Sequence, residues 1–509
     1  MVKPLPFQFT PACLAGLALG WALLGRHLTG AGFPVNDFWQ LFDQASTLAW
    51  QEPASWFNGF FPIGYPLLLA IGPGPLTPDT AWALHLGVVT CLVWGIASLL
   101  HALRGPWAAW LGAGLTLFSP GLITYVLTPG PDLAAAAAIA WALVAFHRAQ
   151  EAPGASWAAL LGGLCLAVAL LLRGHLLVLA LAMLLAGGLL GYLRAGGPLR
   201  WATLGVGAGV LIHGLLQTLA GHGPFETAQA FNIYRQVYPV SWWDPPRQLD
   251  VSVWSMVAEA KLRYLDATLR GVPWLFPSLL PALLMGCLAP VERGGALGRF
   301  LFLSGLPYAL AVSLALSERA PIPLLPIWVV ATALLVVELM AQLRAALPVP
   351  GTARWATALG VTCFAATVLL ASVRQDWMAL RQLRHTSDVY AQLEALARQH
   401  GVTRAEQIFS DNHEIYFLGL PGWRPSTNGT WGVLPNAVWQ YERRHPRFDV
   451  QSWPRFLADC RRRDVRLLML TPDAHSWQPY FSALLRHVSP FVEQARPIGA
   501  VGEFEVFRL

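Results

Sequence analysis

Long apolar runs separated by short polar stretches restrict this chain's fold more than any other feature. A helix needs about 20 apolar residues to cross the hydrocarbon core of a bilayer. Runs that reach or approach this length lie at 11–28, 81–103, 106–122, 131–147, 157–172, 175–193, 201–220, 272–290, 299–316, 321–341 and 355–373. Only 12% of the residues are charged, about half of the usual share in soluble domains. We therefore expect a mostly α-helical, polytopic membrane bundle with about eleven spans.

Basic residues in the short loops predict the orientation of this bundle. If the N-terminus is cytoplasmic, the short turns on the outer side contain chiefly Arg26, Arg173 and Arg319. The inner loops then contain Lys3, Arg104, Arg148, Arg194, Arg200, Arg293, Arg299, Arg344 and Arg354. The positive-inside rule favours this arrangement, and an odd number of spans then places the C-terminus outside.

Three longer segments lie on the outer face in this orientation: the loops 29–80 and 221–271, and everything after about residue 374. The last segment loses the continuous hydrophobicity. It contains two strand-like stretches, at 407–420 and 465–472, and two amphipathic helical stretches, at 388–401 and 453–464. We therefore expect a transmembrane domain at 1–373 and a small extracytoplasmic α/β domain at 374–509.

Several short motifs follow one another on the outer side. Asp37 follows the first span, and its loop continues into "FFPIGYP" at residues 60–66. Later come "TPGPD" at 128–132, "LLRGH" at 171–175 and "SERAPIPLLP" at 317–326. In this order and on this side, the motifs resemble GT-C-fold membrane glycosyltransferases of the protein O-mannosyltransferase and aminoarabinose-transferase type.

The resemblance implies an inverting transfer of a sugar from a polyprenyl-phosphate donor to a lipid, glycan or protein acceptor. The reaction would take place at the outer face of the bacterial cytoplasmic membrane, among membrane lipids and without nucleic acid. Asp37 matches the catalytic acid of the first outer loop, and Asp132 matches the acid that caps a later span. Phe38 stands where the family often has a second acid, so a divalent metal site is disfavoured and no cofactor is assigned.

Transfer from a lipid phosphate needs a general base for the acceptor hydroxyl and cations near the departing phosphate. Asp37 is suited to be the base; the alternative is a loop acid that caps a helix beginning near Phe38. Asp132 is either a site acid that orients the acceptor or holds the donor sugar, or a simple helix cap.

The arginines on the outer side have two interpretations. Arg173 lies between two apolar runs with no acid nearby in sequence, so we expect an anionic partner. A lipid phosphate would meet this need, with His175 as a second ligand, whereas snorkelling toward lipid headgroups is the alternative. Arg319, which matches the arginine that opens a late span in the family although Ala320 replaces the usual tyrosine, has the same alternatives.

Four further residues are expected substrate contacts: Asp43 and Tyr65 in the first outer loop, and Tyr234 and Trp242 in the loop 221–271. Aromatic residues at an interface stack on sugar rings but more commonly anchor a protein among headgroups. Two other functions stay open. A transporter or flippase of lipid-linked sugars would need polar residues at mid-membrane. A non-enzymatic membrane scaffold would be favoured if the Asp37→Asn variant retained the protein's activity.

Overall fold

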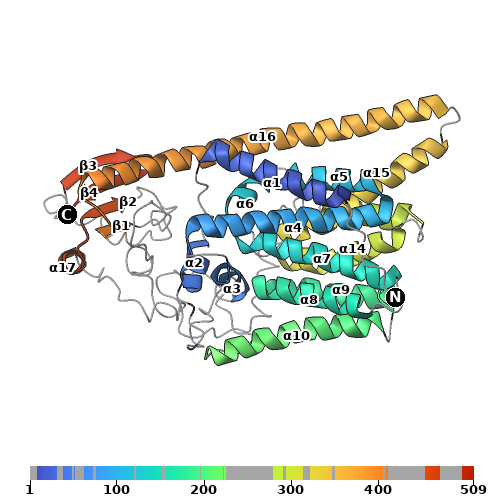
Figure 1. Ribbon diagram of the computed structural model, residues 1–509, viewed down its shortest axis with the longest axis horizontal. Helices are drawn as coiled ribbons and strands as arrows, with labels where there is room; N and C mark the ends of the chain where they lie inside the picture. The colour runs from blue at the N-terminus through green and yellow to red at the C-terminus, as the bar shows by residue number, and fades with distance from the viewer. Residues whose placement is uncertain are drawn as a thin grey trace, which may run out of the picture.

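The computed structural model describes a helical bundle with a small α/β unit beyond one end (Figure 1). The described residues are 9–30, 38–46, 48, 51, 62–72, 76–119, 122–151, 156–194, 197–221, 223–224, 279–290, 294–312, 321–346, 350–404, 407–410, 453–470 and 496–509. Within some of these helices individual side chains, including that of Asp43, are outside the description.

The helices of the bundle follow the predicted apolar runs closely. They are α1 (Phe9–Thr29), α4 (Pro78–Arg104), α5 (Pro106–Leu117), α6 (Leu122–Leu127), α7 (Pro131–Glu151), α8 (Ser156–Leu172), α9 (Leu177–Leu189), α10 (Pro198–Leu219), Leu279–Leu288, α14 (Gly295–Val312), α15 (Leu325–Ala346) and α16 (Pro350–Gln399). Short helices α2 (Phe38–Ser46) and α3 (Gly64–Ala70) and the 3-10 turns η2 (Gly174–Leu176) and η4 (Ile322–Leu324) connect them.

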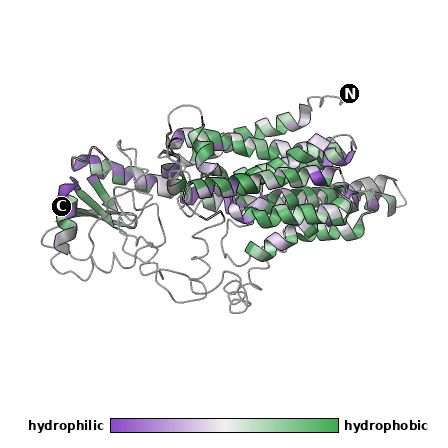
Figure 2. Cartoon of the chain, turned by 90° about the horizontal axis from the view of Figure 1, so that it is seen from below, coloured by the Kyte–Doolittle hydropathy of each residue, from purple (hydrophilic) through white to green (hydrophobic). Residues whose placement is uncertain are grey.

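Among the described residues, six helices are long and apolar enough to cross a membrane, and three shorter helices are also apolar. The expectation of a mostly α-helical membrane protein is therefore confirmed. The number of eleven spans stays a prediction. The helices of the bundle consist mainly of hydrophobic residues, whereas the part of the chain toward the α/β unit is more hydrophilic (Figure 2).

Proline and threonine residues set the starts of the helices. Thr77 caps α4 because its hydroxyl accepts a hydrogen bond from the Thr80 amide at 3.1 Å, while the Thr77 amide donates to the Thr80 hydroxyl at 2.9 Å. Proline stands at the first position of α4, α5 and α10, where its missing N–H costs no helical hydrogen bond. These caps fix where each helix enters the bundle.

Antiparallel packing collects helix ends that are far apart in the sequence. We call the end nearer the α/β unit the domain end; there α1 ends at Thr29, α7 begins at Pro131 and α8 ends at Leu172. Arg26 near the end of α1 pairs with Asp79 near the start of α4 at 2.5 Å. The opposite end, which we call the far end, holds its own ion pair between Arg104 and the buried Glu338 at 4.0 Å.

Exposed tryptophans mark the far end. Trp107, Trp157 and Trp201 lie in the first turns of α5, α8 and α10, and Trp355 lies in the second turn of α16. Their exposed fractions are 83%, 48%, 41% and 80%. These helices all begin at the far end (Figure 1). Tryptophan concentrates where a membrane helix meets the headgroups. The far end therefore has the surface of a membrane–water boundary.

The α/β unit has a four-stranded sheet in the order β1-β2-β4-β3. Strands β1 (Ile408–Ser410) and β2 (Leu467–Leu470) are parallel, and α17 (Trp453–Arg462) precedes β2. The strands β3 (Arg496–Val501) and β4 (Phe504–Arg508) form an antiparallel hairpin that the sequence analysis did not predict. The expectation of a small α/β unit is confirmed.

The last turns of α16 form the other half of this unit. Tyr390, Leu393 and Ala397 are buried against sheet residues that include Met469 and Val506. The helix stops before Gly401, whose φ of +76° lies in the left-handed region that favours glycine. Because α16 runs without a break through residue 373, the predicted division at 373/374 falls inside one continuous helix, and the two-domain division stays a prediction.

Candidate functional site

A buried ion pair at the domain end joins two predicted site residues. A terminal guanidinium nitrogen of Arg173 donates a hydrogen bond to the Asp132 carboxylate at 2.8 Å, although 41 positions separate the residues. The side chains are only 12% and 9% exposed. Burying two charges is costly unless they are paired, so each residue neutralises the other.

The ends of two helices create this contact. Asp132 occupies the first turn of α7, where a carboxylate interacts favourably with the helix dipole. Arg173 follows the last residue of α8 and has an extended backbone with φ of −145° before the turn η2. Its amide still donates to the Ala169 carbonyl at 2.9 Å. The backbone is therefore held while the long side chain projects toward α7.

The pair lies deeper in the bundle than the nearby surface charges. The part of α7 from Asp132 to Arg148 is about 24 Å long at 1.5 Å per residue, whereas α4 measures about 38 Å from Asp79 to Arg104. Asp79 is 83% exposed and Asp132 is buried. The start of α4 also extends further toward the domain end than the start of α7 (Figure 1), so the ion pair lies below the level at which α4 begins.

Helix α3 brings Tyr65 to the same place. Gly64 begins α3 directly against the end of α8, and a Cβ on Gly64 would lie 2.4 Å from the Leu171 carbonyl oxygen. This close approach buries Tyr65, which is 1% exposed. Burial raises the pKa of the Tyr65 phenol and the Asp132 carboxylate raises it further, so Tyr65 stays a protonated hydrogen-bond donor.

Two aromatic rings complete the described surroundings. The His175 ring stacks on the ring of Tyr308 from α14, with centroids 5.8 Å apart and planes inclined by 25°. Tyr308 is fully buried directly after Pro307, in the interior of its helix. The Asp132 charge acts on Tyr65, His175 and Tyr308, which places these polar groups within its electrostatic reach.

His85 adds a buried polar group on α4. Its Nε2 lies 2.7 Å from the Tyr125 carbonyl oxygen, so Nε2–H is the donor. The Asp132 charge also acts on this ring. Among the described residues, Asp132 is thus the charge that Tyr65, His85, His175 and Tyr308 share. We call Asp132, Arg173, His175, Tyr65 and Tyr308 the ion-pair site.

The structure brings together four of the predicted site residues: Asp132, Arg173, His175 and Tyr65. Arg173 has an anionic partner, as its sequence position led us to expect, and this partner is the protein's own Asp132. Binding of a lipid phosphate by Arg173 stays a prediction. The pairing could not be predicted from the sequence, because the two residues are 41 positions apart. Tyr308 was missed, although a tyrosine after proline inside an apolar run, "SGLPYAL", was a visible signal.

The other predicted site residues fall outside the described part of the chain. They are Asp37, Arg319, Tyr234, Trp242 and the side chain of Asp43. For Asp37 and Arg319, described elements that follow closely in the chain pack near the site. Helix α2, which begins one residue after Asp37, buries Phe38 and Phe42 and packs against α3. The turn η4, which begins three residues after Arg319, packs against α7.

The described residues contain no cluster of side chains that could hold a metal ion. No group of three or more histidine, cysteine, aspartate or glutamate residues lies together within the described ranges. The ion-pair site contains one carboxylate, which Arg173 already neutralises. These residues do not fit a divalent cation, so no chemical step is assigned to one.

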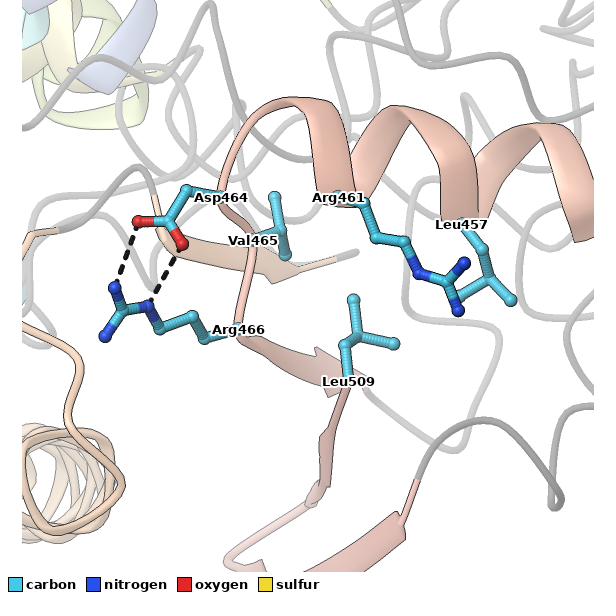
Figure 3. A pocket seen from close by; sticks show the side chains of 6 residues that line it. All are labelled: Leu457, Arg461, Asp464, Val465, Arg466 and Leu509. Carbon is cyan, nitrogen blue, oxygen red and sulfur yellow. Dashed lines mark hydrogen bonds and ion pairs between the residues drawn. The ribbon is translucent and has the colours of Figure 1, made fainter.

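A pocket of about 310 Å³ lies in the α/β unit, away from the ion-pair site (Figure 3). Its lining is Leu457, Arg461, Asp464, Val465, Arg466 and Leu509. Asp464 is paired with Arg466 at 3.2 Å, and Arg466 also donates to the Gly401 carbonyl at 3.0 Å. These bonds connect β2 to the end of α16, which indicates a structural role for Arg466.

Comparison with solved structures gives the fold. The structure of ArnT from Cupriavidus metallidurans bound to undecaprenyl phosphate matches with a TM-score of 0.53 and 12% identity, covering 97% of each chain. The apo state of the same protein matches with a TM-score of 0.52. The apo oligosaccharyltransferase of Archaeoglobus fulgidus gives 0.50 at 13% identity, covering 94% of this chain and 71% of that chain.

No protein-family model matches the sequence, and no curated protein sequence matches it. The likeness to the solved structures extends over almost the whole chain, including the α/β unit. These neighbours are GT-C-fold proteins. The predicted GT-C-like architecture is therefore confirmed at the level of the fold.

Proposed function

We propose that this chain, which has the fold of ArnT and of an archaeal oligosaccharyltransferase, is a membrane glycosyltransferase that uses a polyprenyl-phosphate sugar as donor. Sugar transfer would occur at the domain end of the bundle with inversion at the sugar carbon. The acceptor is a hydroxyl-bearing lipid, glycan or protein. The proposal places the reaction on the outer face of a bacterial cytoplasmic membrane.

The ion-pair site is the observation that carries this proposal. A paired arginine and aspartate are buried together with two tyrosines at the end of a membrane bundle. Arginine presents a planar fork of donors that matches phosphate oxygens. Tyrosine and carboxylate groups hydrogen-bond to sugar hydroxyls. One compact site thus contains groups for both parts of a lipid-phosphate sugar. ArnT, which shares the fold, was solved with undecaprenyl phosphate bound.

The proposed chemistry divides between two acids and two arginines. Asp37 is the general base that takes the proton from the acceptor hydroxyl. As the hydroxyl oxygen attacks the sugar carbon, the bond from that carbon to the phosphate oxygen breaks. Arg173, and Arg319 in our proposal, stabilise the negative charge that develops on the departing phosphate. Asp132 holds a hydroxyl of the sugar or acceptor.

The transporter alternative has less support in the described spans. Binding sites of transporters lie near mid-membrane, often at broken helices. In the bundle helices other than α16, whose charged residues lie outside the predicted span 355–373, the described charged residues instead lie toward the helix ends, as with Asp79 and Arg104 in α4. Glu338 is the most interior of them, and it is buried near Arg104 at the far end. This distribution favours reaction at one face over passage through the bundle.

The direct test is donor consumption. The purified protein in lipid nanodiscs is incubated with a panel of polyprenyl-phosphate sugars and a membrane-lipid extract as acceptor, and the released polyprenyl phosphate is quantified. We expect release from at least one donor together with a glycosylated product. Movement of intact donor across sealed vesicles without any release would instead identify a transporter.

A further inference from the structure

We propose that the Asp132–Arg173 ion pair is a lock that an incoming lipid phosphate opens. In this exchange the phosphate oxygens take the Arg173 guanidinium, and the Asp132 carboxylate is released to hydrogen-bond to a sugar or acceptor hydroxyl. No covalent bond changes in this step. The inference rests on the proposed function, because it names the regulation of the same site.

Competition for the guanidinium is the first reason. The pair occupies a region where both side chains are about nine-tenths buried. Charges at such sites interact strongly because the effective dielectric constant is low. A phosphate that approached Arg173 while Asp132 stayed in place would meet a negative charge at the same guanidinium. Binding is therefore linked to separation of the pair.

The hydrogen-bond geometry is the second reason. Arg173 reaches Asp132 through one terminal nitrogen at 2.8 Å. Arginine binds phosphate best through two parallel N–H···O bonds. Arg173 lies outside α8 and α9 on an extended residue, so a change of its side-chain rotamer breaks no backbone hydrogen bond of these helices. The exchange replaces the ion pair with a partner that carries more charge and more acceptor atoms.

The surrounding phenols are the third reason. A carboxylate released inside the bundle would be costly without new donors. Tyr65 and Tyr308 are 1% and 0% exposed, and the Asp132 charge acts on both. A protonated phenol donates a strong hydrogen bond to a carboxylate. These tyrosines can stabilise Asp132 after Arg173 turns toward the phosphate.

Binding of undecaprenyl phosphate to nanodisc-embedded protein tests the lock, with undecaprenol and inorganic phosphate as separate arms. Asp132→Asn removes the competing charge, so its Kd for undecaprenyl phosphate should fall about tenfold, in the usual range of coupling between linked equilibria. Sugar transfer by this variant should be lost. The double variant Asp132→Asn/Arg173→Gln should lose this gain in affinity for undecaprenyl phosphate. Asp132→Asn should not increase the affinity for undecaprenol. It should increase the affinity for inorganic phosphate only if the lipid tail is not needed for binding.

Tyr308→Phe keeps the ion pair and supplies a second test. It should raise the Kd about threefold or more in the wild-type background, through loss of a donor to the released carboxylate. It should leave the Kd unchanged in the Asp132→Asn background, where no carboxylate is released. If Asp132→Asn does not fold, an unchanged Kd in Tyr308→Phe alone overturns the lock.

Asp79→Asn is the matched control, since it removes a carboxylate from the exposed ion pair with Arg26 at the same end of the bundle. Its Kd should equal that of the wild type. Folded Asp132→Asn protein that binds undecaprenyl phosphate no more tightly than wild type overturns the lock. If wild-type protein binds neither undecaprenyl phosphate nor any polyprenyl-phosphate sugar, the proposed function itself fails.

Discussion

The Cα of Gly64 lies so close to the Leu171 carbonyl that a Cβ there would sit 2.4 Å from its oxygen. This contact joins the start of α3 to the end of α8, and it sets the position of Tyr65 within reach of the Asp132 charge. Gly64→Ala must push α3 away from α8, because backbone atoms cannot yield as a flexible side chain does. We expect a loss of about 1–3 kcal/mol in stability, the usual cost of overpacking.

The measurement for Gly64→Ala is thermal unfolding together with donor turnover. Gly87→Ala on α4 is the control, since no atom lies within 4 Å of its Cβ position. The control should keep its Tm and its activity. A Gly64→Ala variant with unchanged Tm and turnover would show that Tyr65 does not need its present position.

Asp37→Asn should abolish sugar transfer while the protein still folds and binds the donor. Loss of a general base costs about a hundredfold or more in rate. Initial rates with saturating donor give kcat, and Tm reports folding. Near-normal turnover would return Asp37 to the role of a helix cap before α2. Asp79→Asn serves again as a control, because Asp79 is an exposed acid at the same end of the bundle.

Arg173→Lys separates phosphate binding from a simple need for a cation. Lysine keeps the positive charge and the ion pair with Asp132, but it lacks the planar fork. We expect KM for the donor to rise at least about fivefold while Tm changes little. A headgroup-seeking role predicts equal KM values for lysine and arginine. Arg26→Lys provides the comparison, since Arg26 is paired with Asp79 and stacks 4.0 Å above the Trp82 ring.

The orientation of the bundle can be tested with a reporter fused after Leu509. The arginine-rich short loops belong to the far end, which we therefore expect to face the cytoplasm. An alkaline phosphatase reporter should be active, since it folds only outside the cytoplasm, and a cytoplasmic fluorescent reporter should be dark. The reverse pattern would move the ion-pair site to the cytoplasmic face and contradict the choice of donor.

Helix α16 offers a test of where the bilayer lies. Trp355 and Trp377 are both exposed, 80% and 59%, and at 1.5 Å per residue about 33 Å separates them. This length matches a hydrocarbon core of about 30 Å. Cys363→Arg places a charge on an exposed position between them, at a cost of about 3 kcal/mol. We expect less inserted protein for Cys363→Arg than for Trp355→Arg, as measured by membrane fractionation and protease protection.

The sequence by itself determined the apolar helices of this protein. Apolar runs of sufficient length can satisfy their backbone hydrogen bonds in a membrane only as helices, so α4, α7 and α8 follow from local composition. The helical pattern of 388–401 and the strand-like pattern of 465–472 are local in the same sense, and both are confirmed. The order of the outer motifs also predicted the GT-C-like architecture that the solved structures share.

Tertiary structure alone decided which polar groups meet. The partner of Arg173 is Asp132, and no local pattern encodes a contact across 41 positions. Tyr308 joined the site for the same reason, because its helix packs where η2 turns back toward the bundle. A buried charge must find its counter-charge wherever packing brings one within reach, since an unpaired charge removed from water is costly. The sequence thus predicted that Arg173 needs an anion, and the packing of α7 against α8 decided which one it has.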